Sequence, residues 1–263
     1  MSRAGRPPAQ SDHEVREKMM DAAVQLLEER GGLSARAEVL NLEEVIARAG
    51  VSRSAVFRVW RAAPTHSGRS GPRELFLEEL LAHLAGPDFT EASSFDVQTL
   101  VVAQQVLDQV RADAPIEARR AALLESVRLG ALQNYCALIS RQSWKNFVIL
   151  SLTARSMPEG PQRERVLELL RVSDDTATNA MANFYRGAFD ALGLRPKPPF
   201  TVEDACALLA RLGGAIVEGL AVHHFSQSSV TAERIDLNGS PWSLASLGFL
   251  AVTDALVEVV EPE

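Results

Sequence analysis

Apolar residues recur at helical spacing along most of this 263-residue chain. In the segment 42–49 they stand at i, i+3, i+4 and i+7, on one face of a predicted helix, as Leu42, Val45, Ile46 and Ala49. No segment shows the strict alternation of apolar and polar residues that is typical of strands. Neither a glycine-rich phosphate loop nor an internal repeat is present. The pattern predicts an all-α fold.

A second short helix is predicted to follow directly, after a tight turn at 49–51. Gly50 suits a helix end that requires positive φ, and the Ser52 hydroxyl can cap the next helix. The predicted buried side of this second helix carries Val51, Ala55, Val56, Val59 and Trp60, and its exposed side carries Arg53, Ser54, Phe57, Arg58 and Arg61. This is the outline of a helix-turn-helix, in which a short basic helix fits the major groove of DNA. An ordinary helix hairpin on the surface is the alternative.

The basic charge of the chain is concentrated around this segment. From 48 to 73 the sequence contains six arginines, one histidine and no acidic residue. Residues 1–80 carry 12 basic and 12 acidic side chains, so the net charge of −7 arises from the 15 basic and 22 acidic side chains that follow. This distribution favours contact with phosphates near the predicted helix pair.

The N-terminal residues resemble the DNA-binding domain of the TetR (tetracycline repressor) family of transcriptional regulators. The segment 16–31, with its paired alanines and closing glycine, is similar to the family's first helix, and 49–52 matches its turn. Phe57 and Trp60 occupy its two aromatic positions, and 74–76 resembles the start of the following helix. These motifs cover about a third of the chain, and the remainder resembles the family only in its helical layout.

The resemblance implies a three-helix DNA-binding domain at 1–85 and a larger helical domain for effector binding and dimerisation at 86–263. Residues 1–12 are expected to form a mobile arm. The family analogy also implies a homodimer that binds double-stranded DNA at a pseudo-palindromic operator, acts as a repressor and is released by a small-molecule effector. The expected DNA-binding residues are Ser52, Arg53, Ser54, Phe57, Arg58, Arg61 and Arg73.

Within this set, Arg53, Ser54 and Arg58 are the candidates for base edges, since arginine can bridge two acceptors of guanine. Arg61, Arg73 and the backbone near Ser52 are the candidates for phosphates.

The sequence departs from the family pattern at several positions. Phe57 stands where the family usually has tyrosine, and Arg73 follows a proline where the family usually has lysine. The connections 32–41 and 61–71 are longer than usual. A helical interaction protein that has lost specific operator binding is therefore the alternative function.

Beyond residue 85 the pattern predicts further helices. The first is capped by Ser93 or Ser94, and two more lie near 116–135 and 138–157. A long helix at about 162–192 is expected to stop at Gly193. Thr201 and Asp204 cap the next helix, and a final helix is expected at about 242–259. The proline-rich segment 195–199 is expected to be a stiff connector. Gly213, Gly214 and Gly219 inside a predicted helix indicate the close approach of another helix.

Two further sets of residues are assigned by analogy with the family. Polar and aromatic side chains on otherwise apolar helices are the candidates for the effector site: Gln104, Tyr135, Gln142, Trp144, Phe147, Tyr185 and Arg186. The last two helices are expected to form a four-helix dimer interface through Leu212, Ile216, Gly219, Leu220, His223, Leu247 and Leu250. Completion of a monomer core is the alternative role of these two helices.

Other chemistry is weakly indicated. Cys136 and Cys206 fit neither a zinc site nor a disulfide framework and are expected to be free, buried thiols. His223 and His224 point about 100° apart on a helix and cannot chelate one ion as an i, i+4 pair would.

We expect no enzymatic activity, metal or cofactor. With no signal-peptide pattern and no run of 18 apolar residues, a cytoplasmic protein without a membrane partner is expected.

Overall fold

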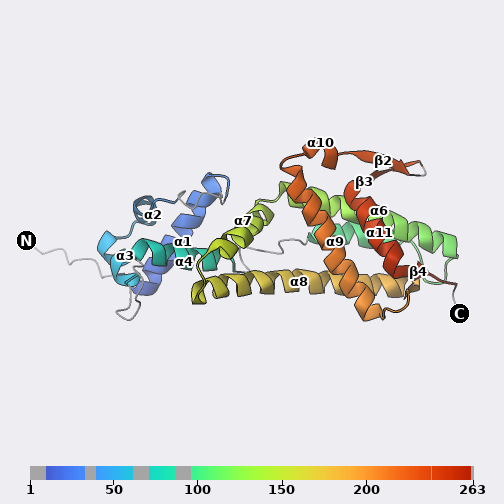
Figure 1. The fold of residues 1–263 in the computed structure, drawn as a ribbon, viewed down its shortest axis with the longest axis horizontal. Helices are drawn as coiled ribbons and strands as arrows, with labels where there is room; N and C mark the ends of the chain where they lie inside the picture. The colour runs from blue at the N-terminus through green and yellow to red at the C-terminus, as the bar shows by residue number, and fades with distance from the viewer. Residues whose placement is uncertain (1–9, 33–39, 62–70, 87–95, 238, 262–263) are drawn as a thin grey trace, which may run out of the picture. The chain divides into compact units, whose positions relative to one another are not determined.

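The computed structural model describes residues 10–32, 40–61, 71–86, 96–237 and 239–261. Most of these residues are helical, which confirms the all-α prediction, and a few short strands accompany the helices. The chain forms two compact units, whose elements are labelled in Figure 1. The N-terminal unit comprises Met1–Thr90 and Lys145–Leu170, and the C-terminal unit comprises Glu91–Trp144 and Arg171–Glu263.

The elements divide between the units as follows. The N-terminal unit contains α1 (Asp12–Glu29), α2 (Leu42–Ala49), α3 (Arg53–Val59) and α4 (Pro72–Leu84). The C-terminal unit contains α5 (Val97–Leu107), α6 (Ile116–Ser140), α9 (Val202–His224), α10 (Ser228–Thr231) and α11 (Leu244–Leu256). Helices α7 (Gln142–Ser156) and α8 (Pro161–Leu192) contribute residues to both units. In the C-terminal unit β1 (Leu194–Pro196) pairs antiparallel with β4 (Val257–Val259), and β2 (Arg234–Leu237) with β3 (Ser240–Ser243).

The core of the N-terminal unit is formed by α1 to α4 together with residues of α7 and α8. Helix α1 packs against α2, α3 and α4, and Val15, Val45 and Val56 are completely buried. Leu150 of α7 and Val166 of α8 belong to the same apolar core. The unit therefore extends beyond the predicted domain 1–85, because helices assigned to the effector domain supply part of its core.

Local signals set the helix ends of this unit. Gly50 ends α2 in the left-handed conformation with a φ of 61°, and the Ser52 hydroxyl caps α3 by accepting a hydrogen bond from the Ala55 N–H at 3.2 Å. Both observations confirm the predicted turn. Ser11 caps α1 in a capping box with Glu14, so the expected mobile arm at 1–12 is wrong for its last residues. Residues 1–9 of that arm lie outside the described residues.

Helix α6 is central to the C-terminal unit, where it packs against α5, α9 and α11 (Figure 1). The capping box of Thr201 and Asp204 at the start of α9 is present as predicted. Cys206 of α9 is buried in the core, whereas Cys136 of α6 is exposed, and both are free thiols. The expectation of two buried thiols is therefore wrong for Cys136.

Several predicted helix ends in this unit need correction. The final helix is shorter than 242–259, because Trp242 lies in β3 and Ser243 caps α11 by accepting a hydrogen bond from the Ser246 N–H at 3.0 Å. At its other end Val257 to Val259 leave the helix to pair with β1. Helix α6 continues to Ser140, past the predicted end at 135. Asp96 caps α5, and the two serines proposed for that role lie outside the described residues.

Helix α9 has the length and apolar composition that a membrane span would need, alone among the helices in the described ranges. Ala205, Leu209 and Val217 of this helix are buried inside the C-terminal unit. A core helix of a globular unit passes the same test of length and composition, so this feature is weak evidence of a span.

Candidate functional site

The α3 helix presents a basic face to solvent. Arg53, Ser54, Phe57 and Arg58 are exposed on one side, while Ala55 and its neighbours on the other side are buried. Phe57 is 42% exposed, so its ring is accessible on the same side of the helix as the two arginines. The division of this helix into a buried and an exposed side agrees with the sequence pattern.

Trp60, directly after α3, fixes this helix against the rest of the N-terminal unit. Its indole N–H donates to Glu79 Oε2 at 2.7 Å, and its ring meets the Phe76 ring edge to face at 5.2 Å between centroids. The Arg16 guanidinium lies 5.5 Å from the Trp60 ring centroid and also pairs with Glu79. Side chains of α1 and α4 therefore hold the end of α3 in a defined position.

Carboxylates from elsewhere in the fold neutralise arginines that have no acidic neighbour in sequence. Arg58 Nε donates to Asp12 Oδ1 at 2.9 Å. Arg53 Nη2 lies 3.2 Å from Glu43 Oε1, and its guanidinium also covers the Phe57 ring at 5.3 Å from the centroid. Exposed ion pairs of this kind contribute little free energy, so both arginines can exchange a carboxylate for another anion.

Arg48 is engaged more firmly than the arginines of α3. Its two terminal nitrogens donate to the two carboxylate oxygens of Glu29 at 2.7 and 2.9 Å. These hydrogen bonds lower the pKa of the Glu29 carboxyl below its ordinary value. Arg61 and Arg73 are exposed and form no ion pair with any residue in the described ranges. Residues 62–70, which hold the remaining basic residues of the acid-free stretch, lie outside the description.

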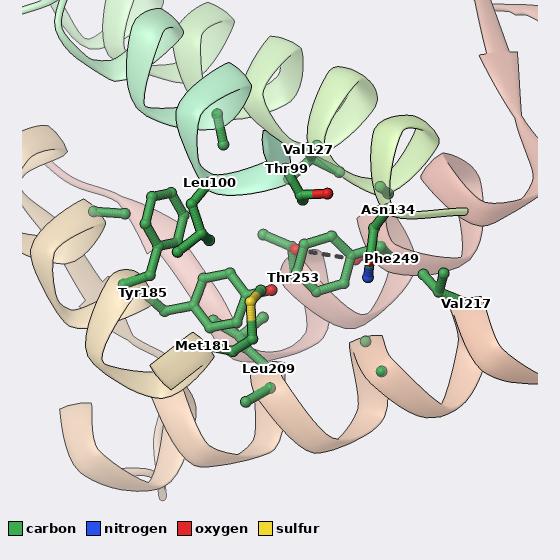
Figure 2. Close-up of a pocket in the computed structure, with 18 of the residues that line it drawn as sticks. Thr99, Leu100, Val127, Asn134, Met181, Tyr185, Leu209, Val217, Phe249 and Thr253 are labelled. Carbon is green, nitrogen blue, oxygen red and sulfur yellow. Dashed lines mark hydrogen bonds between the residues drawn. The ribbon is translucent and has the colours of Figure 1, made fainter. Parts of the chain in front are cut away.

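A cavity of about 360 Å³ lies within the C-terminal unit (Figure 2). It is lined by α5, α6, α8, α9 and α11, with Leu194 of β1 and Val257 of β4. Most of the lining is apolar, and Thr99, Asn134 and Tyr185 are among its uncharged polar members. Such a volume lies in the range of small-molecule sites.

The polar groups of the cavity differ in their electrostatic state. Burial raises the pKa of the Tyr185 phenol above its ordinary value, so the hydroxyl is neutral at physiological pH. Partial burial also raises the pKa of Asp174, the negative charge of Asp175 raises it further, and Arg211 opposes both effects. Asp174, Asp175 and Arg211 all line the cavity, together with Glu218.

Of the seven residues predicted for the effector site, Tyr185 is the one that lines this cavity. Gln104, Gln142 and Arg186 are exposed on their helices. These three long polar side chains are solvated, as is usual for such residues on a helix surface.

The aromatic candidates are occupied by structural contacts. The Tyr135 hydroxyl lies 2.9 Å from His224 Nδ1, within hydrogen-bond distance, and the Trp144 ring stacks on the Phe225 ring at 5.9 Å between centroids. Phe147 packs against the core of the N-terminal unit. Each of these side chains therefore has a role in packing within its own unit.

Sequence reasoning missed the α6 side of the cavity. The residues there are small or short, and they recur at the spacing of one helical face, as Ser126, Val127, Gly130, Ala131 and Asn134. Small residues leave space between packed helices. The run of small or short side chains on one face of α6 was therefore the sequence signal that could have predicted a cavity.

The residues predicted for a dimer interface differ in their exposure in the single chain. Leu212, Gly219 and His223 are exposed on α9, and Leu212 is 45% exposed. Ile216 packs against Gly248 of α11, inside the unit. The remaining residues of the set are partly buried: Leu220, Leu247 and Leu250.

Close packing explains one of the three glycines of α9. A Cβ at Gly213 would lie 2.5 Å from Cε2 of Phe249, so only glycine allows this approach of α11. A Cβ at Gly214 or Gly219 would meet nothing within 4 Å.

Within the described ranges, no group of three or more His, Cys, Asp or Glu side chains is placed to hold a metal ion. Comparison with known protein families, with characterised proteins and with solved structures finds no match to this chain. Its function is therefore inferred from its own residues.

Proposed function

We propose that this chain is a cytoplasmic, TetR-like transcriptional regulator, acting as a repressor that binds a pseudo-palindromic DNA operator as a homodimer. The observation that carries the proposal is the exposed face of α3, where Arg53, Ser54, Phe57 and Arg58 stand on a helix that Trp60 fixes in place. Arginine side chains can bridge O6 and N7 of guanine, and an exposed phenylalanine can contact a thymine methyl group.

The exposed side of α9 supports a symmetric dimer. Leu212, Ala215, Gly219 and Val222 are exposed and follow one another at i, i+3 or i+4 spacing, which gives a continuous stripe of apolar or small residues. A two-fold axis through such a stripe would bring the same surface of two copies together. Two copies could then read two half-sites about one helical turn apart, roughly 34–36 Å.

The cavity supports regulation by a small molecule. It lies between α5, α6, α8, α9 and α11, and α9 also carries the proposed dimer stripe. A ligand that binds one dimer arrangement more tightly than another would shift the population of the DNA-binding form.

The decisive test is selection of random DNA sequences by the purified full-length protein, followed by sequencing. An inverted repeat with half-site centres about 10 base pairs apart, or a multiple of one helical turn, is the expected result. Weak binding without sequence preference would instead indicate a helical interaction protein that has lost operator recognition.

Replacing Arg53 with alanine is expected to weaken binding to the selected operator by about 1–3 kcal/mol, the range for one good base contact. Glu43→Gln is the matched control, because it breaks the same ion pair while leaving the arginine in place. Fluorescence anisotropy at fixed salt should show wild-type or tighter binding for Glu43→Gln. Equal affinity of Arg53→Ala and wild type would remove Arg53 from the set of base-reading residues.

A further inference from the structure

The side chain of Asn134 is a polar group that lacks a partner inside the cavity wall. It is only 9% exposed, and its Oδ1 atom has no hydrogen-bond partner among the described residues. Figure 2 shows this amide directed from α6 toward the space between the helices, on the side opposite Tyr185 in this view. Leaving a buried amide unpaired costs free energy, so such groups usually bind water or a ligand.

The residues that line the cavity extend over several turns of α8. Along α8 its lining runs from Asp174 to Phe189, which corresponds to roughly 22 Å at the rise of an α-helix. A lining that extends over several helical turns can accommodate a chain-like molecule.

The charges in the lining oppose one class of ligand. Three carboxylates, those of Asp174, Asp175 and Glu218, face the cavity with one cation, Arg211. Asp175 also pairs with Arg171, which lies outside the lining. The lining itself therefore holds more carboxylates than cations, which disfavours a carboxylate or phosphate in the cavity.

We propose that the cavity binds an elongated apolar molecule without negative charge, whose hydroxyl or amide group hydrogen-bonds to the Asn134 side chain. Rotation of the side-chain amide by about 180° exchanges the positions of its oxygen and nitrogen. Asn134 can therefore hydrogen-bond to a group that both donates and accepts. A hydroxyl or an amide is such a group, whereas an alkyl chain alone would leave Asn134 unpaired. The role of this molecule as effector rests on the proposed regulatory function, but its binding does not.

The test measures binding of 1-decanol and of decanoate to the full-length protein at neutral pH, in the absence of DNA, by isothermal titration calorimetry. These probes share an apolar chain and differ in charge at one end. We expect 1-decanol to bind and decanoate to bind at least about ten-fold more weakly. Asp174→Asn should narrow that difference by strengthening the binding of decanoate. Equal affinity for the two probes in the wild-type protein would overturn the proposal.

Substitution of Asn134 by leucine tests the hydrogen bond, since leucine has a similar size and no polar group. The affinity for 1-decanol should fall about 5- to 50-fold, the range expected when one buried hydrogen bond is lost. Asn179→Leu on the exposed side of α8 is the matched control and should bind as wild type does. The ligand-free Asn134→Leu protein should unfold at the wild-type temperature or above, because it removes an unpaired buried group.

Unchanged affinity of Asn134→Leu for 1-decanol would overturn the assignment of Asn134. Because these measurements contain no DNA, failure of the operator selection would leave them intact. Conversely, a palindromic operator together with no 1-decanol binding would refute only the ligand assignment.

Discussion

Replacing Arg119 with methionine is expected to lower the free energy of unfolding of the C-terminal unit by about 3 kcal/mol, because three backbone carbonyls lose a charged donor. Arg119 is 1% exposed. Its Nε donates to the Ala114 carbonyl at 3.0 Å, Nη1 to that of Leu192 at 3.0 Å, and Nη2 to that of Val260 at 2.6 Å. One side chain thus joins the start of α6 to the end of α8 and to the end of the chain beyond β4.

The size of this effect follows from what surrounds the guanidinium. No carboxylate pairs with Arg119 among the described residues, so its charge is balanced by peptide dipoles. Leu192 is the last residue of α8, where carbonyls lack partners within the helix and the helix dipole is negative. Hydrogen bonds to a charged group contribute about 1.5–3 kcal/mol each, and water entering the variant would restore part of the loss.

Thermal unfolding followed by circular dichroism measures the loss. A change of about 3 kcal/mol corresponds to a decrease in Tm of roughly 6–12 °C for a chain of this size. Arg120→Met is the matched control, since Arg120 is the exposed neighbour of Arg119, and its effect should stay within about 0.5 kcal/mol. Equal Tm values for the two variants would show that the carbonyl contacts of Arg119 contribute nothing to stability.

Arg119 also shows why sequence patterns fail for some buried residues. Arg119 and Arg120 are adjacent arginines, and nothing near them distinguishes the buried one from the exposed one. Two of the carbonyl partners of Arg119 are 73 and 141 residues away in sequence. Contacts over such separations are set by the tertiary fold, which local periodicity does not encode.

The α2–α3 pair was predictable because its determinants are local. Gly50 and Ser52 act within one helical turn of their positions, and the buried and exposed sides of α3 follow from a spacing of 3.6 residues. The charge argument from the same segment was wrong on one point, that no carboxylate neutralises these arginines. Arginines of this acid-free stretch form ion pairs with Asp12, Glu29 and Glu43, because α1 and α2 pack beside α3.

The cavity was the feature hardest to predict from the sequence, because no residue pattern directly marks an empty space between helices. Aromatic residues such as Tyr135 and Trp144 drew attention in the sequence, yet they pack against His224 and Phe225. The space itself depends on short side chains from several helices that meet only in the folded chain. The end of α11 was mispredicted for a similar reason, since residues 257–259 pair with β1 far away in sequence.

Replacing Leu212 with glutamate is expected to prevent dimerisation and to lower the affinity for the selected operator at least about 100-fold. Leu212 is 45% exposed in the single chain, so the substitution should leave the fold intact. In a two-fold dimer formed through the α9 stripe, the change enters the interface twice and buries two carboxylates without partners. A monomer would retain one half-site contact and lose the gain that two linked half-sites provide.

Sedimentation equilibrium measures the oligomeric state of Leu212→Glu, and fluorescence anisotropy measures its affinity for the operator. Leu152→Glu is the control, because Leu152 of α7 is 65% exposed and undergoes the same change of charge outside α9. The control should match wild type in both measurements, and circular dichroism should give wild-type Tm values for both variants. A Leu212→Glu protein that stays dimeric with wild-type operator affinity would exclude the α9 stripe as the interface. The dimer contacts would then have to lie on another surface of the chain.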